Sequence, residues 1–198
     1  MQDGVIGALA ARRGHFRLES GHHGALWLDL ELLFLRPRLI EPFARELARR
    51  LSGYAIEMVC GPLVEGAFVA QIVAAELNVE FAYTERFVYP RREGLYPVEY
   101  RLPGALRSAA RGKSVAVVND VINAGSAVRG TFADLRACEA RPVAVGALVV
   151  LGTWASAFAA DQALPLESIA SLPDEVWAPA ACPLCAAGMP LMDIESSS

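Results

Sequence analysis

The chain has 198 residues, a formal net charge of −4 and a sequence pI near 5.4. This acidic balance excludes the broad positive field with which proteins hold nucleic acids or acidic membrane surfaces, so we expect neither kind of partner. The length allows one domain with a sizeable core, and the short apolar run near the N-terminus does not fit a signal peptide. We therefore expect a cytoplasmic protein whose cysteines stay reduced.

Residues 1–36 predict a small N-terminal hood. Residues 5–13 favour a short helix, and residues 16–18 and 26–30 favour two short strands joined by the turn-rich segment SGHHG. From about residue 38, apolar residues recur at four-residue spacing with charged residues between them. This pattern predicts an amphipathic helix whose buried stripe is Leu39, Phe43, Leu47 and Leu51.

Residues 37–172 alternate between strand-like and helix-like patterns. Nearly continuous apolar segments such as SVAVVND and PVAVGALVVL predict strands buried on both faces, with helices between them. This order predicts an α/β fold with a parallel central sheet flanked by helices. The uncharged stretch at residues 142–160 is interrupted by glycine and hydroxyl residues, so we expect a buried strand there rather than a membrane span. Residues 173–198 form a tail containing CPLC, and we expect all three parts to make one structural domain.

Two loops and one longer segment are candidates for ligand binding. The loops are CGPLVEGAF at residues 60–68 and NDVINAGSA at residues 119–127, and each follows a predicted strand. Ligands of parallel sheets bind beyond the carboxyl ends of the strands, where such loops converge. Residues 87–102 are polar and aromatic without clear periodicity, which is typical of a lid, a binding loop or disorder.

The loop at residues 119–127 has the composition of a phosphate site. Asn119 and Asp120 end an apolar strand, and four small residues precede a helix: Ala124, Gly125, Ser126 and Ala127. Small side chains let backbone N–H groups approach a phosphate, and the start of a helix favours negative charge. Asp120 is placed to accept hydrogen bonds from two vicinal sugar hydroxyls, which predicts a ribose-5-phosphate cradle. The plain alternative is a strand-to-helix turn in which Asp120 and Ser126 serve only as caps.

The same loop resembles a known signature. Its order of apolar strand, Asp, Val-Ile and Ala-Gly-Ser-Ala is similar to the phosphoribosyl pyrophosphate (PRPP) signature of type I phosphoribosyltransferases, especially orotate phosphoribosyltransferases. Residues 20–29, SGHHGALWLD, resemble that family's hood, CGPLVEGAFVA resembles its pyrophosphate loop, and AACPLCAAGMPL resembles a C-terminal element of some orotate enzymes. The resemblance implies an enzyme of pyrimidine nucleotide synthesis that joins the ribose phosphate of PRPP to a nucleobase and releases pyrophosphate.

The resemblance also implies roles for individual residues. PRPP would be held by Asn119, Asp120, Asn123, Ala124, Gly125, Ser126 and Ala127, and pyrophosphate by Leu63, Val64, Glu65 and Gly66. The expected catalytic residues are Asp120 on the ribose hydroxyls and three arginines that neutralise the leaving group: Arg86, Arg91 and Arg92. Magnesium would arrive with PRPP, bound largely through its oxygens and water, so no dedicated metal cage is expected. Members of this family are commonly homodimers, and we expect one here.

Several positions depart from the family's pattern. Asn119 replaces the first of two adjacent acids, and Asn123 replaces a threonine that helps to bind the base. Gly152 and Thr153 stand where orotate enzymes carry an Asp-Arg pair whose arginine meets the substrate carboxylate. The segment at residues 86–102 lacks the lysines and histidine of the family's catalytic loop, and arginine is a poor proton donor. These departures favour a base other than orotate, or a weakened homologue that binds PRPP or a nucleotide as a sensor or partner subunit.

Histidines and cysteines add two further candidates. His22 and His23 lie in the hood where the family contacts base and pyrophosphate, so with Asn123 they are candidate base-site residues; the alternative is an ordinary surface pair. Cys182 and Cys185 have half the spacing of a zinc site. Because no second CxxC or Cys–His pair is evident, a structural turn is favoured over a redox pair or half of an intersubunit metal site.

Overall fold

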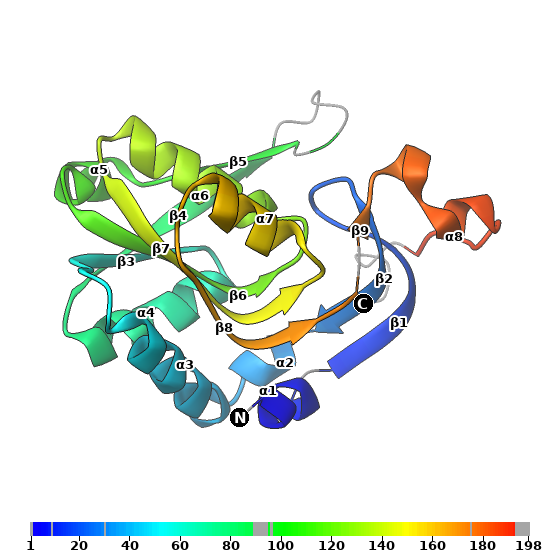
Figure 1. The fold of residues 1–198 in the computed structure, drawn as a ribbon, viewed down its shortest axis with the longest axis horizontal. Coiled ribbons are helices and arrows are strands. Elements are labelled where there is room, and N and C mark those ends of the chain that lie inside the picture. The colour runs from blue at the N-terminus through cyan, green and yellow to red at the C-terminus, as the bar shows by residue number, and fades with distance from the viewer. Residues whose placement is uncertain are drawn as a thin grey trace.

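The computed structural model describes residues 2–8, 10–29, 31–88, 95, 97–174 and 176–192. Its centre is a six-stranded sheet with the strand order β5-β4-β3-β6-β7-β8 (Figure 1). The strands are β3 (Met58–Pro62), β4 (Glu80–Val88), β5 (Val98–Arg101), β6 (Ser114–Ile122), β7 (Arg141–Leu151) and β8 (Leu166–Leu172). All neighbours pair in parallel except β4 and β5, which are antiparallel at the edge. The predicted α/β fold with a parallel central sheet is confirmed.

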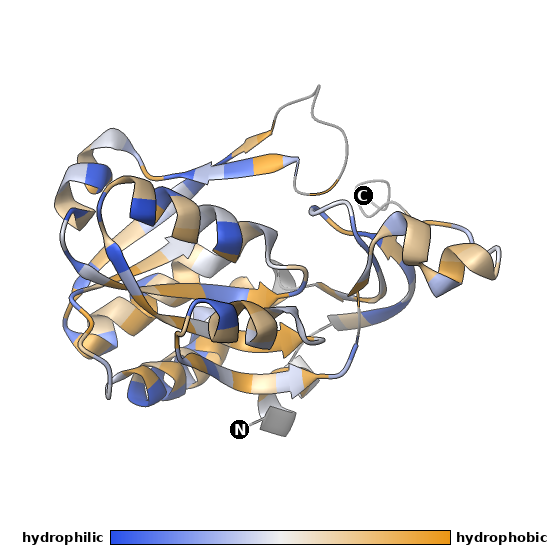
Figure 2. Cartoon of the chain, turned by 45° about the horizontal axis from the view of Figure 1, so that its top comes forward, coloured by the Kyte–Doolittle hydropathy of each residue, from blue (hydrophilic) through white to orange (hydrophobic). Residues whose placement is uncertain are grey.

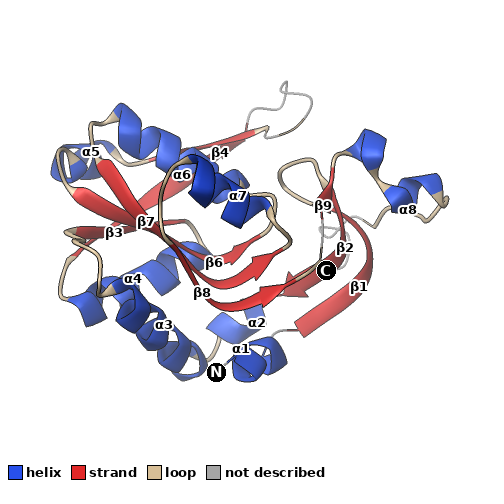
Figure 3. Ribbon diagram, in the orientation of Figure 1, coloured by secondary structure: helices blue, strands red, loops and turns tan. Residues whose placement is uncertain are grey.

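Helices cover both faces of this sheet (Figure 3). One face carries α3 (Pro37–Leu51) and α4 (Glu65–Leu77), and the other carries α5 (Gly104–Ala110), α6 (Ser126–Ala137) and α7 (Trp154–Asp161). Strand β6 shows why both layers are needed: Ala116 and Val118 pack into the core on the α3–α4 side, whereas Val115 and Val117 pack into the other. Alternate residues of a strand point to opposite faces, so an unbroken apolar strand requires two apolar layers. Figure 2 shows this apolar band along the central strands.

Helix α3 buries a different stripe from the predicted one. Leu47 and Leu51 are buried as expected, but Leu39 is 47% exposed and Ile40 and Ala44 take the inner positions. A helix has 3.6 residues per turn, so a strict four-residue repeat rotates by about 40° at each step and drifts off the buried face. The amphipathic helix is confirmed, while the predicted burial of Leu39 is wrong.

The hood forms a second, three-stranded sheet with the order β1-β2-β9. It contains α1 (Gln2–Ala8), β1 (Ala10–Arg17), β2 (His23–Asp29) and α2 (Glu31–Phe34), and its third strand, β9 (Val176–Trp177), comes from the tail. Residues 10–13 pair with β2 instead of continuing the predicted helix, because cross-strand pairing overrides the helical preference of their Ala and Arg side chains. The tail then continues through a 3₁₀ turn (Pro179–Ala181) into the short helix α8 (Pro183–Ala186) beside the hood (Figure 1).

The uncharged stretch at residues 142–160 is β7 followed by α7, as the expected buried strand requires. Among the described residues, no helix has both the length and the apolar character needed to cross a membrane. All four cysteines of the chain are free thiols.

Candidate active site

The loop after β6 is shaped around Gly125. This residue precedes α6 with a φ of +74°, a backbone conformation that residues with a side chain rarely adopt. A Cβ at this position would also lie 1.9 Å from the ring of Trp154, so the indole lies directly against the glycine. Trp154 is itself stacked on Phe158, with ring centroids 4.9 Å apart. Trp154 of α7 therefore packs against this loop. The loop leads into the N-terminus of α6, where a negative charge is favoured.

Asp120 lies near the end of β6, and the pKa of its carboxyl group is unusually high. Burial raises the pKa of Asp120 to about 7, although hydrogen bonds from the backbone N–H groups of Val121 and Asp120 itself oppose the shift. The nearby carboxylate of Glu65 raises this pKa further. A carboxyl pKa raised in this way is typical of functional sites, because a bound cation or hydroxyl donors would stabilise the charged form.

Asn119, near the end of β6, contacts the second predicted loop. Its side chain is buried, and its Nδ2 donates a hydrogen bond of 2.8 Å to the carbonyl of Val121. Its Oδ1 lies so close to Gly66 that a Cβ there would be 2.1 Å away. The side chain thus supports the turn with one of the two N–H groups of its amide.

The second predicted loop runs from β3 into α4. The Leu63–Val64 peptide bond is cis, the Leu63 N–H donates to the carbonyl of Thr84 at 2.9 Å, and Val64 is exposed. Glu65 is the first residue of α4, where the positive end of the helix favours a carboxylate. The contact between Gly66 and Asn119 sets this loop against the loop after β6. The structure thus brings the two loops together at the carboxyl ends of neighbouring strands.

Asn123 lies at the corner of the phosphate loop. Its Oδ1 is buried and has no hydrogen-bond partner among the described residues. A buried carbonyl oxygen without a donor is costly, and such groups mark places where a ligand or water completes the structure. The missing partner is a hydrogen-bond donor or a cation.

A carboxylate from the hood reaches this loop, and the sequence gives no sign of it. Glu19 accepts hydrogen bonds from the hydroxyls of Ser126 at 3.1 Å and Tyr100 at 2.7 Å, and it pairs with Arg86 at 2.6 Å. Tyr100 is buried, and burial raises its pKa, so it packs between hood and core instead of forming an open aromatic lid. Arg86 therefore reaches the predicted site, whereas the predicted catalytic residues Arg91 and Arg92 lie outside the described residues.

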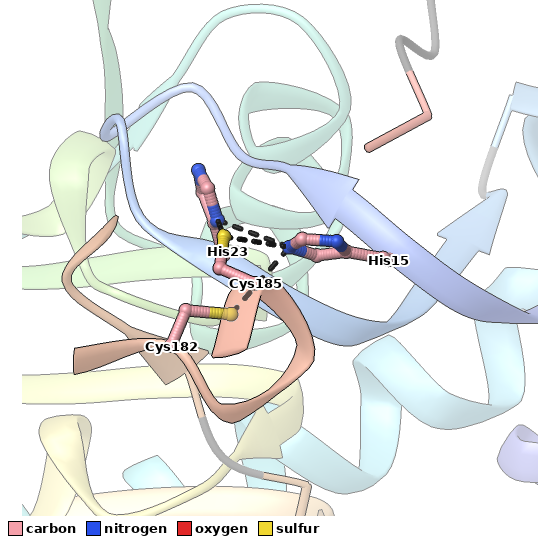
Figure 4. Close-up of side chains that lie close together, drawn as sticks. All are labelled: His15, His23, Cys182 and Cys185. Atoms are coloured by element: carbon pink, nitrogen blue, oxygen red, sulfur yellow. Dashed lines mark hydrogen bonds between the residues drawn. The ribbon is translucent and has the colours of Figure 1, made fainter. Parts of the chain in front are cut away.

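The two hood histidines have different surroundings. His22 is partly buried beside the hydroxyl of Ser20, with its Nδ1 3.1 Å from Ser20 Oγ, and burial lowers its pKa. His23 is only 6% exposed and lies with His15, Cys182 and Cys185 in one cluster (Figure 4). Two histidines, and not a Cys–His pair, thus lie beside the two cysteines of CPLC, an arrangement that the sequence did not indicate. Hairpin pairing between β1 and β2 brings His15 and His23 together, and their spacing in sequence does not reveal it.

The corner after β7 lacks the charge that orotate enzymes are expected to use. Gly152 has a φ of +64° and Thr153 is the exposed residue that precedes α7. Neither residue offers a positive charge to a substrate carboxylate. The next residue, Trp154, instead presents its indole to Gly125.

Comparison with known proteins gives the family. No family model matches the chain. Two relatives named orotate phosphoribosyltransferase are 32% identical: that of Caldanaerobacter subterraneus subsp. tengcongensis over 91% of this chain and 87% of its own length, and that of Thermotoga maritima over 91% and 89%.

Solved structures agree on the fold. Orotate phosphoribosyltransferase from Aeropyrum pernix superposes with a TM-score of 0.61 at 23% identity, covering 86% of this chain and 94% of its own. The adenine phosphoribosyltransferase of Giardia lamblia, solved with 9-deazaadenine, gives 0.64 at 15% identity, covering 87% and 98%. At this level of identity over nearly its whole length, the chain belongs to the orotate phosphoribosyltransferase family of type I phosphoribosyltransferases.

Proposed function

We propose that the chain transfers the ribose phosphate of PRPP to a nitrogenous base and releases pyrophosphate. The observation that carries this proposal is the contact between the two loops, in which Gly66 lies against Asn119 beside Asp120. One loop then suits the leaving pyrophosphate and the other suits the ribose 5-phosphate of the same molecule. We further propose that the protein is a cytoplasmic homodimer.

Each residue of the site has a task in this reaction. Ionised Asp120 accepts hydrogen bonds from the ribose hydroxyls and stabilises the positive charge that develops on the sugar. The backbone of residues 123–127 surrounds the 5-phosphate at the start of α6. Arg86, once released from Glu19, neutralises charge on the departing pyrophosphate. The protein mainly orients the two reactants and stabilises charge.

Magnesium fits this site. The carboxylates of Asp120 and Glu65 are close enough for Glu65 to raise the pKa of Asp120, and such hard oxygen donors suit Mg²⁺ alongside phosphate oxygens and water. These two residues would hold the ion, which would supply positive charge to the leaving pyrophosphate.

We propose that the accepted base is one other than orotate. Gly152 and Thr153 provide no cation, and a carboxylate without a charged partner is costly to bury. The unpartnered Oδ1 of Asn123 favours a base that presents an N–H group to the loop.

A panel assay tests the transfer and the base together. Pyrophosphate release from PRPP and Mg²⁺ is measured with orotate, uracil, adenine, guanine and hypoxanthine in turn. Turnover with at least one base is expected, and efficient turnover with orotate would contradict the argument from Gly152 and Thr153.

The second candidate function is a PRPP or nucleotide sensor without turnover. The contacts of Glu19 favour this function. Its carboxylate accepts a hydrogen bond from the hydroxyl of Ser126 and pairs with the guanidinium of Arg86, two groups that could otherwise bind phosphates. Calorimetric binding of PRPP with no release of pyrophosphate on any base would establish this function in place of transfer.

Glu19→Gln is expected to tighten PRPP binding roughly tenfold, because charge-assisted hydrogen bonds are worth about 1.5–3 kcal/mol and the neutral amide competes less for Ser126 and Arg86. Removing the carboxylate also removes its repulsion of phosphate. Calorimetry with PRPP and Mg²⁺ measures the change. Glu46→Gln on α3 makes the same change of charge away from the loop and should leave the affinity unaltered. Weaker binding by Glu19→Gln would instead mean that Glu19 orients Arg86 for the ligand.

A further inference from the structure

Four potential metal ligands from the two ends of the chain meet beside the hood (Figure 4). His15 comes from β1 and His23 from β2, while Cys182 precedes α8 and Cys185 lies within it. One ligand atom from each residue can be chosen so that all four lie within 4.8 Å of one another. Clusters of this composition are typical of structural zinc sites.

The backbone explains how the cluster forms. Arg17 pairs with His23 across the hairpin, and His15 lies in the stretch between Arg13 and Phe16 where the register of the hairpin shifts. There its Nε2 comes within 3.0 Å of His23 Nδ1. In the tail, a single turn beginning at Cys182 returns Cys185 to the same side, with the N–H of Ala186 donating to the carbonyl of Cys182. The tail is tied to the hood by the Met192 N–H, which donates to the carbonyl of His15 at 2.7 Å.

Four of the six distances among these atoms are close to the edges of a zinc-centred tetrahedron. With bonds of about 2.0–2.1 Å to nitrogen and about 2.3 Å to sulfur, tetrahedral zinc separates two nitrogens by about 3.3 Å and a nitrogen from a sulfur by about 3.6 Å. Here His15 Nε2 lies 3.0 Å from His23 Nδ1 and 3.4 Å from Cys182 Sγ. Cys185 Sγ lies 3.7 Å from His15 Nε2 and 3.3 Å from His23 Nδ1. Small movements would seat one ion among the four atoms.

A hydrogen bond at Nδ1 of His15 orients the other ring nitrogen, Nε2, toward the cluster. His15 Nδ1 lies 2.9 Å from the carbonyl oxygen of Met189. A carbonyl oxygen only accepts hydrogen bonds, so Nδ1 carries the proton and the neutral ring presents a lone pair at Nε2, toward the cluster. Metal-bound histidines are held in this way by a carbonyl or carboxylate on their other nitrogen.

The burial of these ligands distinguishes the site from a catalytic metal centre, which keeps one coordination position open. His15, His23 and Cys182 are 1%, 6% and 3% exposed, and Cys185 covers the open side. Four protein ligands around one ion leave no position for a substrate, which is the pattern of structural sites. The site also uses none of the proposed PRPP-binding residues.

We propose that His15, His23, Cys182 and Cys185 bind one structural zinc ion that fastens the C-terminal tail to the hood. On binding, the two thiols lose their protons to solvent and both imidazoles coordinate in their neutral form. His15 and His23 lie on either side of the loop that carries Glu19. The ion therefore also fixes the two ends of this loop, from which Glu19 contacts Ser126 and Arg86.

Metal analysis of the full-length protein, purified from zinc-supplemented medium without chelator, is expected to give about one zinc ion per chain. Replacing zinc by Co²⁺ should give intense visible bands of a tetrahedral ion together with a near-ultraviolet thiolate-to-cobalt band. Removing the metal with a strong chelator should lower Tm, and adding zinc back should restore it.

Cys185→Ser is the preferred variant because Cys185 is the exposed ligand, and it should lose most of the zinc and the thiolate band. The matched control is Cys138→Ala, which removes a thiol outside the cluster and should retain both. Asp120→Asn should also retain both, which separates this site from any ion held by carboxylates.

The wild-type protein alone decides the matter if Cys185→Ser fails to fold. A folded wild-type protein that carries no zinc and gives no thiolate-to-cobalt band would overturn the proposal, and so would a Cys182–Cys185 disulfide in the freshly purified protein. Zinc content without the thiolate band would assign the ion to another place and overturn it equally.

Discussion

Asp120→Asn is expected to stabilise the protein at pH 8 while weakening its binding of PRPP. Burial raises the folded-state pKa of this carboxyl from an ordinary value of 3.8 to about 7. The native state therefore holds a proton that the unfolded state releases, and stability falls as the pH rises from about 4 to about 7. Asparagine has no charge to bury, so the variant should gain about 2–4 kcal/mol at pH 8 and little at pH 4.

Urea denaturation at both pH values measures this gain. Asp134→Asn provides the contrast, because Asp134 is paired with Arg107 and accepts a hydrogen bond from the N–H of Leu102. Removing that charge should lower the stability at pH 8. If Asp120→Asn were no more stable than the wild type at pH 8, Asp120 would be ionised there without a penalty and its raised pKa would be wrong.

The same substitution should reduce the affinity for PRPP by roughly 10- to 100-fold, since hydrogen bonds to a charged acceptor are worth about 1.5–3 kcal/mol. Calorimetry with PRPP and Mg²⁺ at pH 8 measures the loss. A variant that is more stable yet binds more weakly is the expected signature of a residue kept for function at the expense of stability. Unchanged affinity would remove Asp120 from the ribose site, whatever its effect on stability.

Glu65 tests the electrostatic part of this explanation. Its carboxylate raises the pKa of Asp120, so Glu65→Gln should lower the pH at which Asp120 ionises. The loss of stability with rising pH should still begin near the ordinary pKa of 3.8, but in the Glu65→Gln variant it should be smaller and should level off at a lower pH than in the wild type. NMR titration of the Asp120 carboxyl follows the change directly.

Local sequence patterns predicted the strand and loop at residues 114–130 because their causes are local. An apolar run buried on both faces needs no knowledge of its neighbours, and small residues before a helix form a loop wherever the strand ends. The stripe on α3 was predicted less well, because the choice between Leu39 and Ile40 depends on which way the helix packs against the sheet.

The contacts that local patterns leave out join residues distant in sequence. Glu19 reaches Ser126 across 107 positions, and His15 reaches Cys182 across 167. The CPLC spacing marks half of a metal site, but its other half exists only in the register of the β1–β2 hairpin, which shifts between Arg13 and Phe16. Such a register is set by the whole hood and tail, including the pairing of β2 with β9.

Gly125→Ala is expected to abolish PRPP binding and to lower the free energy of unfolding by about 3 kcal/mol, since a strained positive φ costs about 1–3 kcal/mol and overpacking adds about as much again. Both causes apply here, because the φ is +74° and the new methyl group would lie 1.9 Å from the ring of Trp154. Either the loop or the indole must move. Urea denaturation and calorimetry with PRPP measure the two effects.

Gly112→Ala separates strain from collision. Gly112 has nearly the same φ, +76°, but a Cβ there would meet nothing within 4 Å. This control should lose only the cost of the backbone conformation, about 1–2 kcal/mol, and should bind PRPP normally. Adding Trp154→Ala to Gly125→Ala removes the collision, so the double variant should regain part of the lost PRPP affinity. If Gly125→Ala behaved like Gly112→Ala, the indole would not be holding the phosphate loop, and the shape of the cradle would have to come from β6 and α6 alone.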